Sequence, residues 1–263
     1  MKIYADGSDQ TLICLDYDFA QDSPAFRGLS RQRFGEGIEI KGTWNYEHAH
    51  KGLCVLVAYE GTRAVGQVEF LPIEHAPQPV SGEGLTFINC LAVMAQAQGR
   101  GIGSALLEAC RTEAMQRSDG LACLAYLTGP FMPAAFFRRH GLRLASTAED
   151  AELLYQTWAD AQPPELLPRL LAPRPEPGRV TVDYFWCGQC PHAARTRDRL
   201  RQVARQLGPR VLLRETNTDD RATLQRWGIA SGLYVNGRQV FCSPPRLAEW
   251  EIRQALEGAL NAT

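Results

Sequence analysis

The chain has 263 residues and a net charge of −1, with 45% hydrophobic and 22% charged residues. This length can bury a large core and suffices for two ordinary domains. The near-neutral charge excludes the basic surface with which proteins neutralise nucleic-acid phosphates, so we expect small-molecule or protein partners and no nucleic acid. The first ten residues, MKIYADGSDQ, do not show the basic region followed by an apolar stretch that is typical of a signal peptide. No window of the sequence is apolar enough to span a bilayer. We therefore expect a cytoplasmic protein without membrane association.

Apolar runs in the first 160 residues predict a β-sheet. The runs CVLVAYE, AVGQVEFLPI and LTFINCLAV are typical of strands, and a turn at 61–63 makes the first two antiparallel. After a glycine-rich loop, apolar residues recur at helical spacing from Ile102. LACLAYLT predicts another strand, and a short helix then begins after Pro133 and ends at Gly141. The sequence thus predicts an α/β (α+β) domain over residues 1–160.

A proline-rich stretch at 161–178, AQPPELLPRLLAPRPEPG, excludes regular helix and predicts a semi-rigid linker. Residues 179–263 then predict a second domain with the order βα, βα, ββα. Its clearest feature is the hairpin LYVNGRQVF, because Asn236-Gly237 suits a two-residue turn with positive φ. This order is the minimal thioredoxin arrangement, so we expect a small thioredoxin-like domain.

The loop Gln98-Gly99-Arg100-Gly101-Ile102-Gly103 stands between a strand and a helix. Backbone N–H groups and the positive end of the helix dipole there face one point, which suits a pyrophosphate. The glycines let the main chain approach phosphate oxygens closely, and Arg100 adds a positive charge. A tight turn without a ligand would use the same glycines, so the loop alone leaves both interpretations open.

In its context this loop resembles the acetyl-CoA motif of the GNAT acetyltransferases, Gln/Arg-x-x-Gly-x-Gly/Ala, and FFRRHGL resembles the family's FYxxxGF segment. The resemblance covers about residues 1–155 and implies a GNAT fold with a mixed, mainly antiparallel sheet that binds acetyl-CoA (coenzyme A). A Rossmann fold fits less well, because the loop follows antiparallel strands rather than a first βαβ unit. The implied cofactor contacts are Leu91, Ala92, Val93, Gln98, Gly99, Arg100, Gly101, Ile102, Gly103 and Ser104.

A second resemblance extends over nearly the whole chain. RGLSRQRFGEGIEIK, QVEFLPIEHAP, INCLAV, CGQCP and LYVNGRQV are similar to segments of the YoaP-like acetyltransferases, which are GNAT proteins with a fused C-terminal domain. Together the two resemblances imply an N-acetyltransferase that uses acetyl-CoA and carries a C-terminal thioredoxin-like domain.

Acetyl transfer to an amine needs a base for the amine and donors for the oxyanion. Glu69 is the first candidate base, because a carboxylate inside an apolar strand is unusual; Glu74 and His75 are alternatives. The resemblance implies that backbone N–H groups around Leu91–Val93 hold the oxyanion, on what is otherwise a simple core strand.

The general acid is open. Many GNAT enzymes have a Tyr where this chain has Phe137, which has no proton to donate. Tyr126 and Cys90 are candidates to replace it, although either could simply pack in the core. CoA thiolate could also leave without a dedicated acid, since a thiol is a good leaving group near neutral pH.

Cys187 and Cys190 form a CxxC pair between a strand and a helix, as in a thioredoxin active site. The helix dipole is expected to favour a thiolate on Cys187, with Cys190 buried and resolving. However, IASGLYV lacks the proline that this fold sets opposite the dithiol. A soft-metal or metalloid site that includes Cys242, or a docking domain with incidental cysteines, therefore remains an alternative, and no metal is assigned.

Two functions follow. The first is transfer of an acetyl group from acetyl-CoA to an amine of a small molecule or peptide, with the dithiol domain as an accessory. The second is a thiol redox or soft-metal-binding protein whose GNAT domain binds CoA without efficient catalysis. The sequence does not name the acceptor and leaves a homodimer open. The acceptor pocket is expected in residues 20–50 and 72–84, where Trp44, Tyr46, His48 and His50 could line it.

Overall fold

The computed structural model describes residues 3–6, 11–15, 37–61, 63–242 and 247–262. Its contacts divide the chain into two units: Met1–Leu29 with Asn45–Leu167, and Ser30–Trp44 with Pro168–Thr263. The second unit thus includes a segment from the first fifth of the chain. The two consecutive domains expected from the sequence do not allow for such a segment. No helix in the described ranges combines the length and the apolar character needed to cross a membrane.

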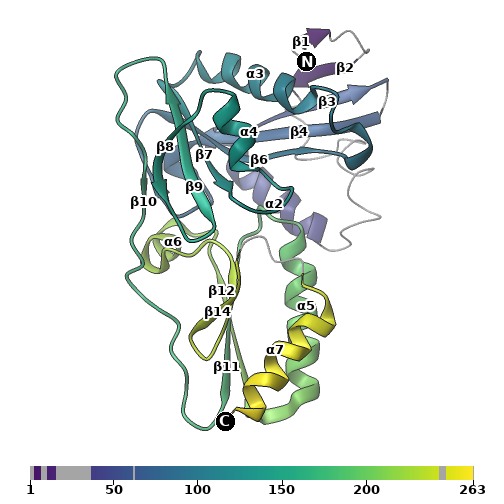
Figure 1. Ribbon diagram of the computed structural model, residues 1–263, viewed down its shortest axis with the longest axis vertical. Helices are drawn as coiled ribbons and strands as arrows, with labels where there is room; N and C mark the ends of the chain where they lie inside the picture. The colour runs from purple at the N-terminus through teal and green to yellow at the C-terminus, as the bar shows by residue number, and fades with distance from the viewer. Residues whose placement is uncertain (1–2, 7–10, 16–36, 62, 243–246, 263) are drawn as a thin grey trace. The chain divides into compact units, whose positions relative to one another are not determined.

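An eight-stranded sheet forms the centre of the first unit, in the order β1-β2-β3-β4-β6-β7-β9-β8 (Figure 1). Every neighbouring pair is antiparallel except β6 and β7, which run parallel, so the sheet is mixed and mainly antiparallel as expected. The strands are β1 (Ile3–Asp6), β2 (Thr11–Leu15), β3 (Cys54–Glu60), β4 (Arg63–Pro72), β6 (Leu85–Val93), β7 (Gly120–Tyr126), β8 (Arg143–Thr147) and β9 (Ala151–Thr157).

Two helices share one apolar core with this sheet. α3 (Ile102–Ala114) contributes Leu106, Leu107 and Cys110, all fully buried, at the helical spacing that the sequence predicts. α4 (Ala134–Arg139) contributes Phe137 to the same cluster, and Gly141, with φ +88°, ends it as expected. The strands contribute Leu56, Val68, Phe70, Ile88 and Cys123.

Several elements of the first unit carried no clear sequence signal. α2 (Gly37–Ala49) has two glycines and few apolar residues, so its sequence shows no helical pattern; its first eight residues belong to the second unit. Two short strands, β5 (Val80–Ser81) and β10 (Glu165–Leu166), form an antiparallel pair. β10 lies within the proline-rich stretch that the sequence predicts to be a linker. Short helical turns occur at η1 (Ile73–His75) and η2 (Ala95–Ala97).

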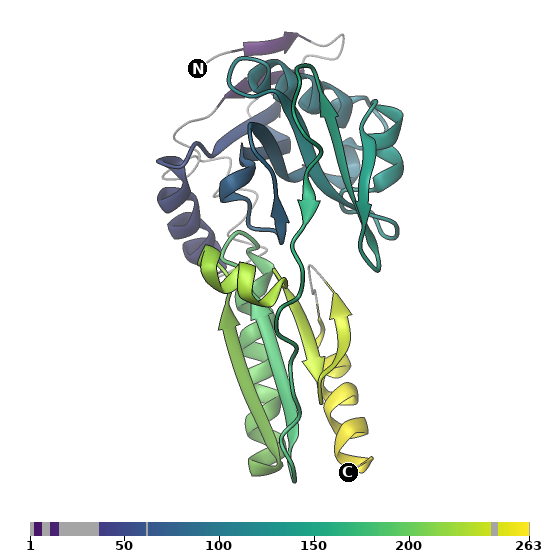
Figure 2. The ribbon, with the colours of Figure 1, turned by 90° about the vertical axis from the view of Figure 1, so that its left-hand side faces the viewer.

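The second unit has a four-stranded sheet in the order β12-β11-β13-β14 (Figure 2). β11 is parallel to β12 and antiparallel to β13, and the β13–β14 turn has positive φ at both Asn236 and Gly237 as expected. One face carries α5 and α7, and Phe185 on the other face contacts Trp227 of α6. The elements are β11 (Val180–Trp186), α5 (His192–Leu207), η3 (Gly208–Arg210), β12 (Val211–Asn217), α6 (Arg221–Trp227), β13 (Gly232–Val235), β14 (Arg238–Cys242) and α7 (Glu249–Asn261).

Candidate active site

β6 leaves β7 halfway along its length. It pairs with β4 from Thr86 to Val93, but with β7 only from Leu85 to Ile88. β7 continues along β9 as far as Tyr126, and the segment just before α4 bridges to Tyr126 from the other side. The β7-facing edge of Leu91–Val93 therefore has no partner strand among the described residues, so N–H groups on this edge can donate to a ligand.

The glycine-rich loop follows directly on this free edge. Gly99 and Gly101 both have left-handed φ, +77° and +81°, which favours glycine, and no atom lies within 4 Å of the place where either would carry a Cβ. Gly101 is the N-cap of α3 and supplies no capping side chain, so the first N–H groups of the helix face open space. Gln98 closes the loop by donating from Nε2 to the Val93 carbonyl oxygen at 3.0 Å.

Gly103 has a different role from the other two glycines. A Cβ there would lie 3.5 Å from the Phe136 ring and 3.7 Å from Leu91 Cδ2, within ordinary van der Waals contact. Gly103 thus faces α4 and β6 with room for a Cβ, while Gly99 and Gly101 leave the outer face of the loop open. Arg100 makes an ion pair with Glu60 at 2.7 Å, so its guanidinium is held at the end of β3.

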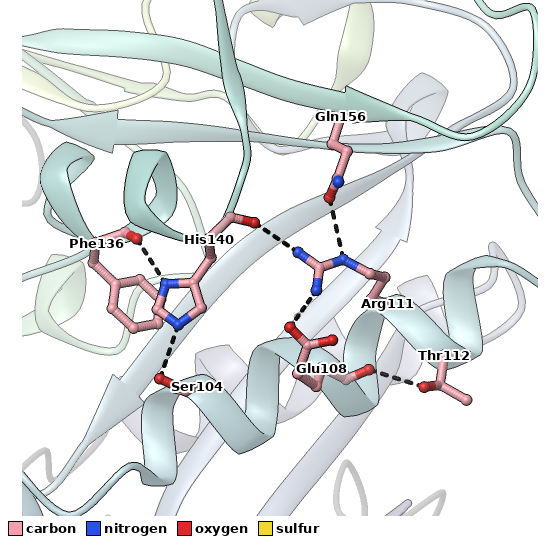
Figure 3. Close-up of polar contacts among 7 residues, drawn as sticks. All are labelled: Ser104, Glu108, Arg111, Thr112, Phe136, His140 and Gln156. Atoms are coloured by element: carbon pink, nitrogen blue, oxygen red, sulfur yellow. Dashed lines mark hydrogen bonds and ion pairs between the residues drawn. The ribbon is translucent and has the colours of Figure 1, made fainter.

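A serine in the first turn of α3 is bound to the end of α4 (Figure 3). His140 Nδ1 lies 2.8 Å from the Phe136 carbonyl oxygen, and its Nε2 lies 2.9 Å from Ser104 Oγ. A carbonyl oxygen only accepts, so Nδ1 carries the proton of the neutral ring and Nε2 accepts from the Ser104 hydroxyl. The ring also lies against Phe136, with centroids 4.4 Å apart. Ser104 is therefore positioned by α4 as well as by its own helix.

Arg111 joins the same two helices at a second point (Figure 3). Its Nη2 donates to the His140 carbonyl oxygen at 2.9 Å, and its Nε donates to Gln156 Oε1 of β9 at 3.1 Å. The third nitrogen contacts Glu108. One guanidinium thus joins α3, the end of α4 and β9.

Polar side chains gather on β4 and β6 at the point where β6 leaves β7. Glu69 is fully buried, accepts a hydrogen bond from Gln67 Nε2 at 3.0 Å, and stands opposite Cys90 in the strand register. A β-bulge makes Asn89 the extra residue beside this pair. Asn89 is 6% exposed, and neither atom of its amide has a hydrogen-bond partner in the described part of the chain. An unsatisfied buried amide costs about 1–3 kcal/mol, so Asn89 suits a ligand group.

The other candidate side chains lie in different places. Glu74 is on η1, which follows the end of β4 farther from the glycine-rich loop. Its carboxylate accepts a hydrogen bond from the Gly84 backbone N–H at 3.2 Å. Tyr126 is buried at the end of β7, three residues beyond the last β6–β7 pair. Leu91 lies equally far beyond that pair on β6. Phe137, where a Tyr was sought, is fully buried in the core. The structure therefore groups Glu69 with Cys90 and Asn89, and sets Glu74 apart from them.

Asn89 is the site residue that sequence reasoning missed. Its signal was present, because an asparagine interrupts the apolar run LTFINCLAV, but the bulge that buries its side chain was not predictable from the run. Of the expected acceptor segments, residues 20–36 lie outside the described residues. In α2, His48 is buried and Tyr46 is exposed with its ring 5.9 Å from that of His50, so the four aromatic candidates do not share one environment.

A protein-family model matches the part of the chain that contains the glycine-rich loop. It describes the acetyltransferase (GNAT) family and matches residues 23–142, a range that contains β3 to α4 with the loop and both helices of the site. The match supports the GNAT family for this part of the chain. The family assignment made from the two motifs is thus supported, and the GNAT enzymes as a class transfer acyl groups from CoA. None of the curated proteins compared with the chain matches it.

Several solved structures are similar to the GNAT region. A GNAT acetyltransferase from Brucella melitensis in complex with acetyl-CoA has 18% identity and a TM-score of 0.39, over 59% of this chain and 92% of that one. The GNAT N-acetyltransferase YhbS from Escherichia coli in complex with CoA has 18% identity and a TM-score of 0.41, over 59% and 86%. An acetyltransferase from Thermus thermophilus has 18% identity and a TM-score of 0.41, over 55% and 96%.

The dithiol lies in the second unit, outside the GNAT match, where the parallel strands β11 and β12 end side by side. Both cysteines are reduced; Cys187 is 5% exposed, and Cys190 is half-buried. The Cys190 backbone N–H donates to the Cys187 carbonyl oxygen at 3.3 Å, which closes the CxxC turn. From the loop after β12, Asp219 Oδ1 accepts from the Gly188 backbone N–H at 2.7 Å.

The surroundings of Cys187 differ from those that the expected thiolate would need. α5 begins at His192, so Cys187 is separated from the helix N-terminus by the whole CxxC turn, and Cys190 stands next to it. Burial, followed by the charge of Asp219, raises the pKa of the Cys187 thiol well above its usual range. The late start of the helix and the nearby carboxylate thus argue against a thiolate on Cys187, while the relative reactivity of the two cysteines stays a prediction.

The described side chains give the dithiol no metal site. Among them, no three His, Cys, Asp or Glu side chains gather in a way that could hold a metal ion. The side chain of Cys242, which the sequence analysis included as a further ligand, is outside the described ones.

Proposed function

We propose that the GNAT region transfers an acetyl group from acetyl-CoA to an amine of a small molecule or peptide. The observation that carries the proposal is the opening of β6 from β7 immediately before an uncapped, glycine-rich helix start. A free strand edge and a free helix N-terminus in succession offer hydrogen-bond donors to two parts of one extended ligand. The family match over 23–142 supports the same activity class.

The residues fit two parts of acetyl-CoA, its pyrophosphate and its pantetheine with the thioester. The N–H groups at the start of α3, with the open faces of Gly99 and Gly101, would hold the pyrophosphate. The free edge of Leu91–Val93 would hold the pantetheine and direct N–H groups at the thioester oxygen. Acetyl-CoA supplies an activated acyl group, and the protein supplies orientation and charge stabilisation.

Acetyl transfer then needs little further chemistry from this chain. The uncharged amine attacks the thioester carbon, the oxyanion is held by the strand-edge N–H groups, and the C–S bond breaks as the carbonyl re-forms. Glu69 takes the proton that the amine loses, directly or through a water. CoA leaves as thiolate, with Cys90 or Tyr126 as the candidates to protonate it. Asn89 would hydrogen-bond the acyl oxygen or the acceptor, since its amide is buried beside Glu69 without a partner in the described part of the chain.

The test is replacement of Glu69 by Gln, which keeps an oxygen to accept from Gln67 but cannot take a proton. With an amine panel and chromatographic detection of CoA, we expect kcat to fall about a hundredfold, while the affinity for acetyl-CoA is unchanged. Glu74→Gln is the matched comparison and should retain wild-type turnover. Loss of turnover in Glu74→Gln with full activity in Glu69→Gln would instead place the base on η1.

Phe137 favours a second candidate function. A core phenyl ring in place of a proton donor suits a domain that binds CoA without efficient catalysis, and a CxxC pair in the second unit suits thiol redox or soft-metal chemistry. We assign the second unit an accessory thioredoxin-like dithiol role on this basis. Binding of acetyl-CoA with no CoA release for any amine of the panel would favour this alternative over acetyl transfer.

A further inference from the structure

The dithiol is placed where two loops meet. β11 and β12 pair in register up to Trp186 and Asn217, so the loops that follow them, containing Cys187 and Asp219, start from the same edge of the sheet. Thr218 joins these segments, because its backbone N–H donates to the Trp186 carbonyl oxygen at 2.9 Å and its hydroxyl donates to the Ala230 carbonyl oxygen at 2.6 Å. The pairing of the two strands thus fixes the position of the Asp219 backbone relative to the CxxC turn.

The two cysteines differ in access. Cys187 is 5% exposed and Cys190 is half-buried, so a disulfide in solution reaches Cys190 more readily. The Cys190 carbonyl oxygen accepts from Ala193 N–H at 3.0 Å at the start of the 16-residue helix α5. The N-terminus of a helix stabilises negative charge, and here Cys190 is the cysteine that adjoins it.

Asp219 is placed to act on the other cysteine. Its Oδ1 is hydrogen-bonded to the N–H of Gly188, the neighbour of Cys187, and its Oδ2 lies 3.0 Å from where a Cβ on Gly188 would stand. Its carboxylate also interacts with the Cys187 thiol, for which Asp219 and Cys190 are the charged groups nearby. Asp219 is itself half-exposed, so a proton it accepts can pass to solvent.

We propose that this site exchanges disulfides with Cys190 as the entry thiol, Cys187 as the resolving thiol, and Asp219 as the base that deprotonates Cys187. The order is the reverse of the one that the CxxC pattern suggests. The inference rests on the accessory dithiol role of the second unit and is independent of acetyl transfer.

The reaction requires the disulfide of a low-molecular-weight thiol as oxidant. The Cys190 thiolate attacks one sulfur of that disulfide, forming a mixed disulfide and releasing one thiolate. Asp219 then takes the proton of the Cys187 thiol, and the Cys187 thiolate attacks the Cys190 sulfur. The Cys187–Cys190 disulfide forms, the second thiolate leaves, and each released thiolate takes up a proton. The protein dithiol is oxidised and the small disulfide is reduced.

The order of attack can be tested with glutathione disulfide on the reduced full-length protein, followed by acid quenching and peptide mass mapping. Cys187→Ser should trap a mixed disulfide at Cys190, and Cys190→Ser should react at Cys187 about tenfold more slowly because that thiol is buried. Faster reaction at Cys187 in Cys190→Ser than at Cys190 in Cys187→Ser would overturn the order. If the wild-type protein forms no Cys187–Cys190 linkage at all, the dithiol role itself fails, whatever the acetyltransferase assay gives.

The role of Asp219 is tested with Asp219→Asn, whose amide oxygen can still accept from Gly188 N–H. We expect the mixed disulfide to form at the wild-type rate but to resolve about a hundredfold more slowly at neutral pH, and to recover as pH rises and the Cys187 thiol ionises unaided. Asp220→Asn is the matched control, because that carboxylate caps α6 by accepting from Thr223 and does not contact the thiol. Wild-type resolution in Asp219→Asn at neutral pH would remove Asp219 as the base.

Discussion

Single side chains decide how well the candidate active site is held. The Phe136 carbonyl oxygen requires a proton on His140 Nδ1, and Arg111 donates to the carbonyl oxygen of that same residue. The Arg111 side chain is only 14% exposed, and its guanidinium makes polar contacts to three elements. A charged hydrogen bond in such surroundings contributes about 1.5–3 kcal/mol, so this arginine matters more than an exposed one.

Arg111→Met should therefore lower the free energy of unfolding by about 2 kcal/mol, because Gln156 and the His140 carbonyl oxygen lose their donor while most of the aliphatic stem is kept. Urea denaturation of the full chain measures it. Arg139→Met, at an exposed arginine of α4, should change the free energy by less than about 0.5 kcal/mol. Equal effects from both substitutions would show that the network contributes little.

Asp183 on β11 gives a pH-dependent prediction at the same scale. Burial raises the pKa of its carboxyl group, Arg214 opposes that rise, and Glu176 adds to it. A raised folded-state pKa means that the ionised carboxylate destabilises the fold at neutral pH, and that stability is gained as pH falls through this pKa. Asp183→Asn should raise the melting temperature at pH 7, and the difference from wild type should vanish below the usual aspartate pKa of about 3.9. A lower melting temperature at pH 7 would mean that the ion pair with Arg214 outweighs burial.

At the scale of elements, the functional arrangement is the succession of a free strand edge, a loop with two left-handed glycines and an uncapped helix. Each is weak alone, because β6 is an ordinary core strand over its first half and α3 an ordinary amphipathic helix. Their order along the chain places the open edge and the open helix start next to each other. Anything that adds negative charge at the junction should therefore act on ligand binding more than on folding.

Gly101→Asp should abolish the rise in melting temperature that acetyl-CoA causes, since a carboxylate would stand where the pyrophosphate binds. Gly101→Asn is the matched control: it has nearly the same shape and incurs a similar cost for the φ of +81°, but carries no charge. We expect the asparagine variant to keep a reduced shift in differential scanning fluorimetry. The same shift in both variants would exclude the loop from pyrophosphate binding.

The sequence predicted these elements because their signals are local. Alternating strands, the helical spacing from Ile102 and the Asn236-Gly237 turn each need only a few consecutive residues. The bulge at Asn89, the burial of Cys187 and the helix α2 depend on partners far along the chain, and no local pattern reveals them. The inverted roles of the two cysteines could not be predicted for the same reason, since Asp219 is distant in sequence.

For the whole molecule, the proline-rich stretch contains the last of the points where the chain passes from one unit to the other. Its start pairs with β5, and beyond Leu170 the Arg174 carbonyl oxygen accepts from Arg214 Nη2 at 2.8 Å. Leu170, between these contacts, is 68% exposed. The domain limits expected from the sequence, 1–160 and 179–263, remain a prediction, because independent folding has yet to be measured.

Limited trypsin digestion tests this division. We expect the first cut after Arg169, which precedes the exposed Leu170, whereas Arg174 precedes a proline and should resist. Mass spectrometry of the early fragments would identify the site. Early cleavage elsewhere, with the stretch from Leu166 to Leu171 intact, would show that the stretch is packed and does not act as a linker.

The first half of α2 also has a consequence for the order of synthesis. Its residues belong with the CxxC turn, where a Cβ on Gly188 would lie 3.3 Å from Trp44 Cβ and the Gly37 backbone approaches Pro191. A ribosome makes Gly37 some time before Pro191, and at 5–20 residues per second this delay is on the order of ten seconds. During that time the nascent helix has none of the partners it has in the second unit. The surroundings of the CxxC turn therefore cannot be complete until the second unit has been synthesised.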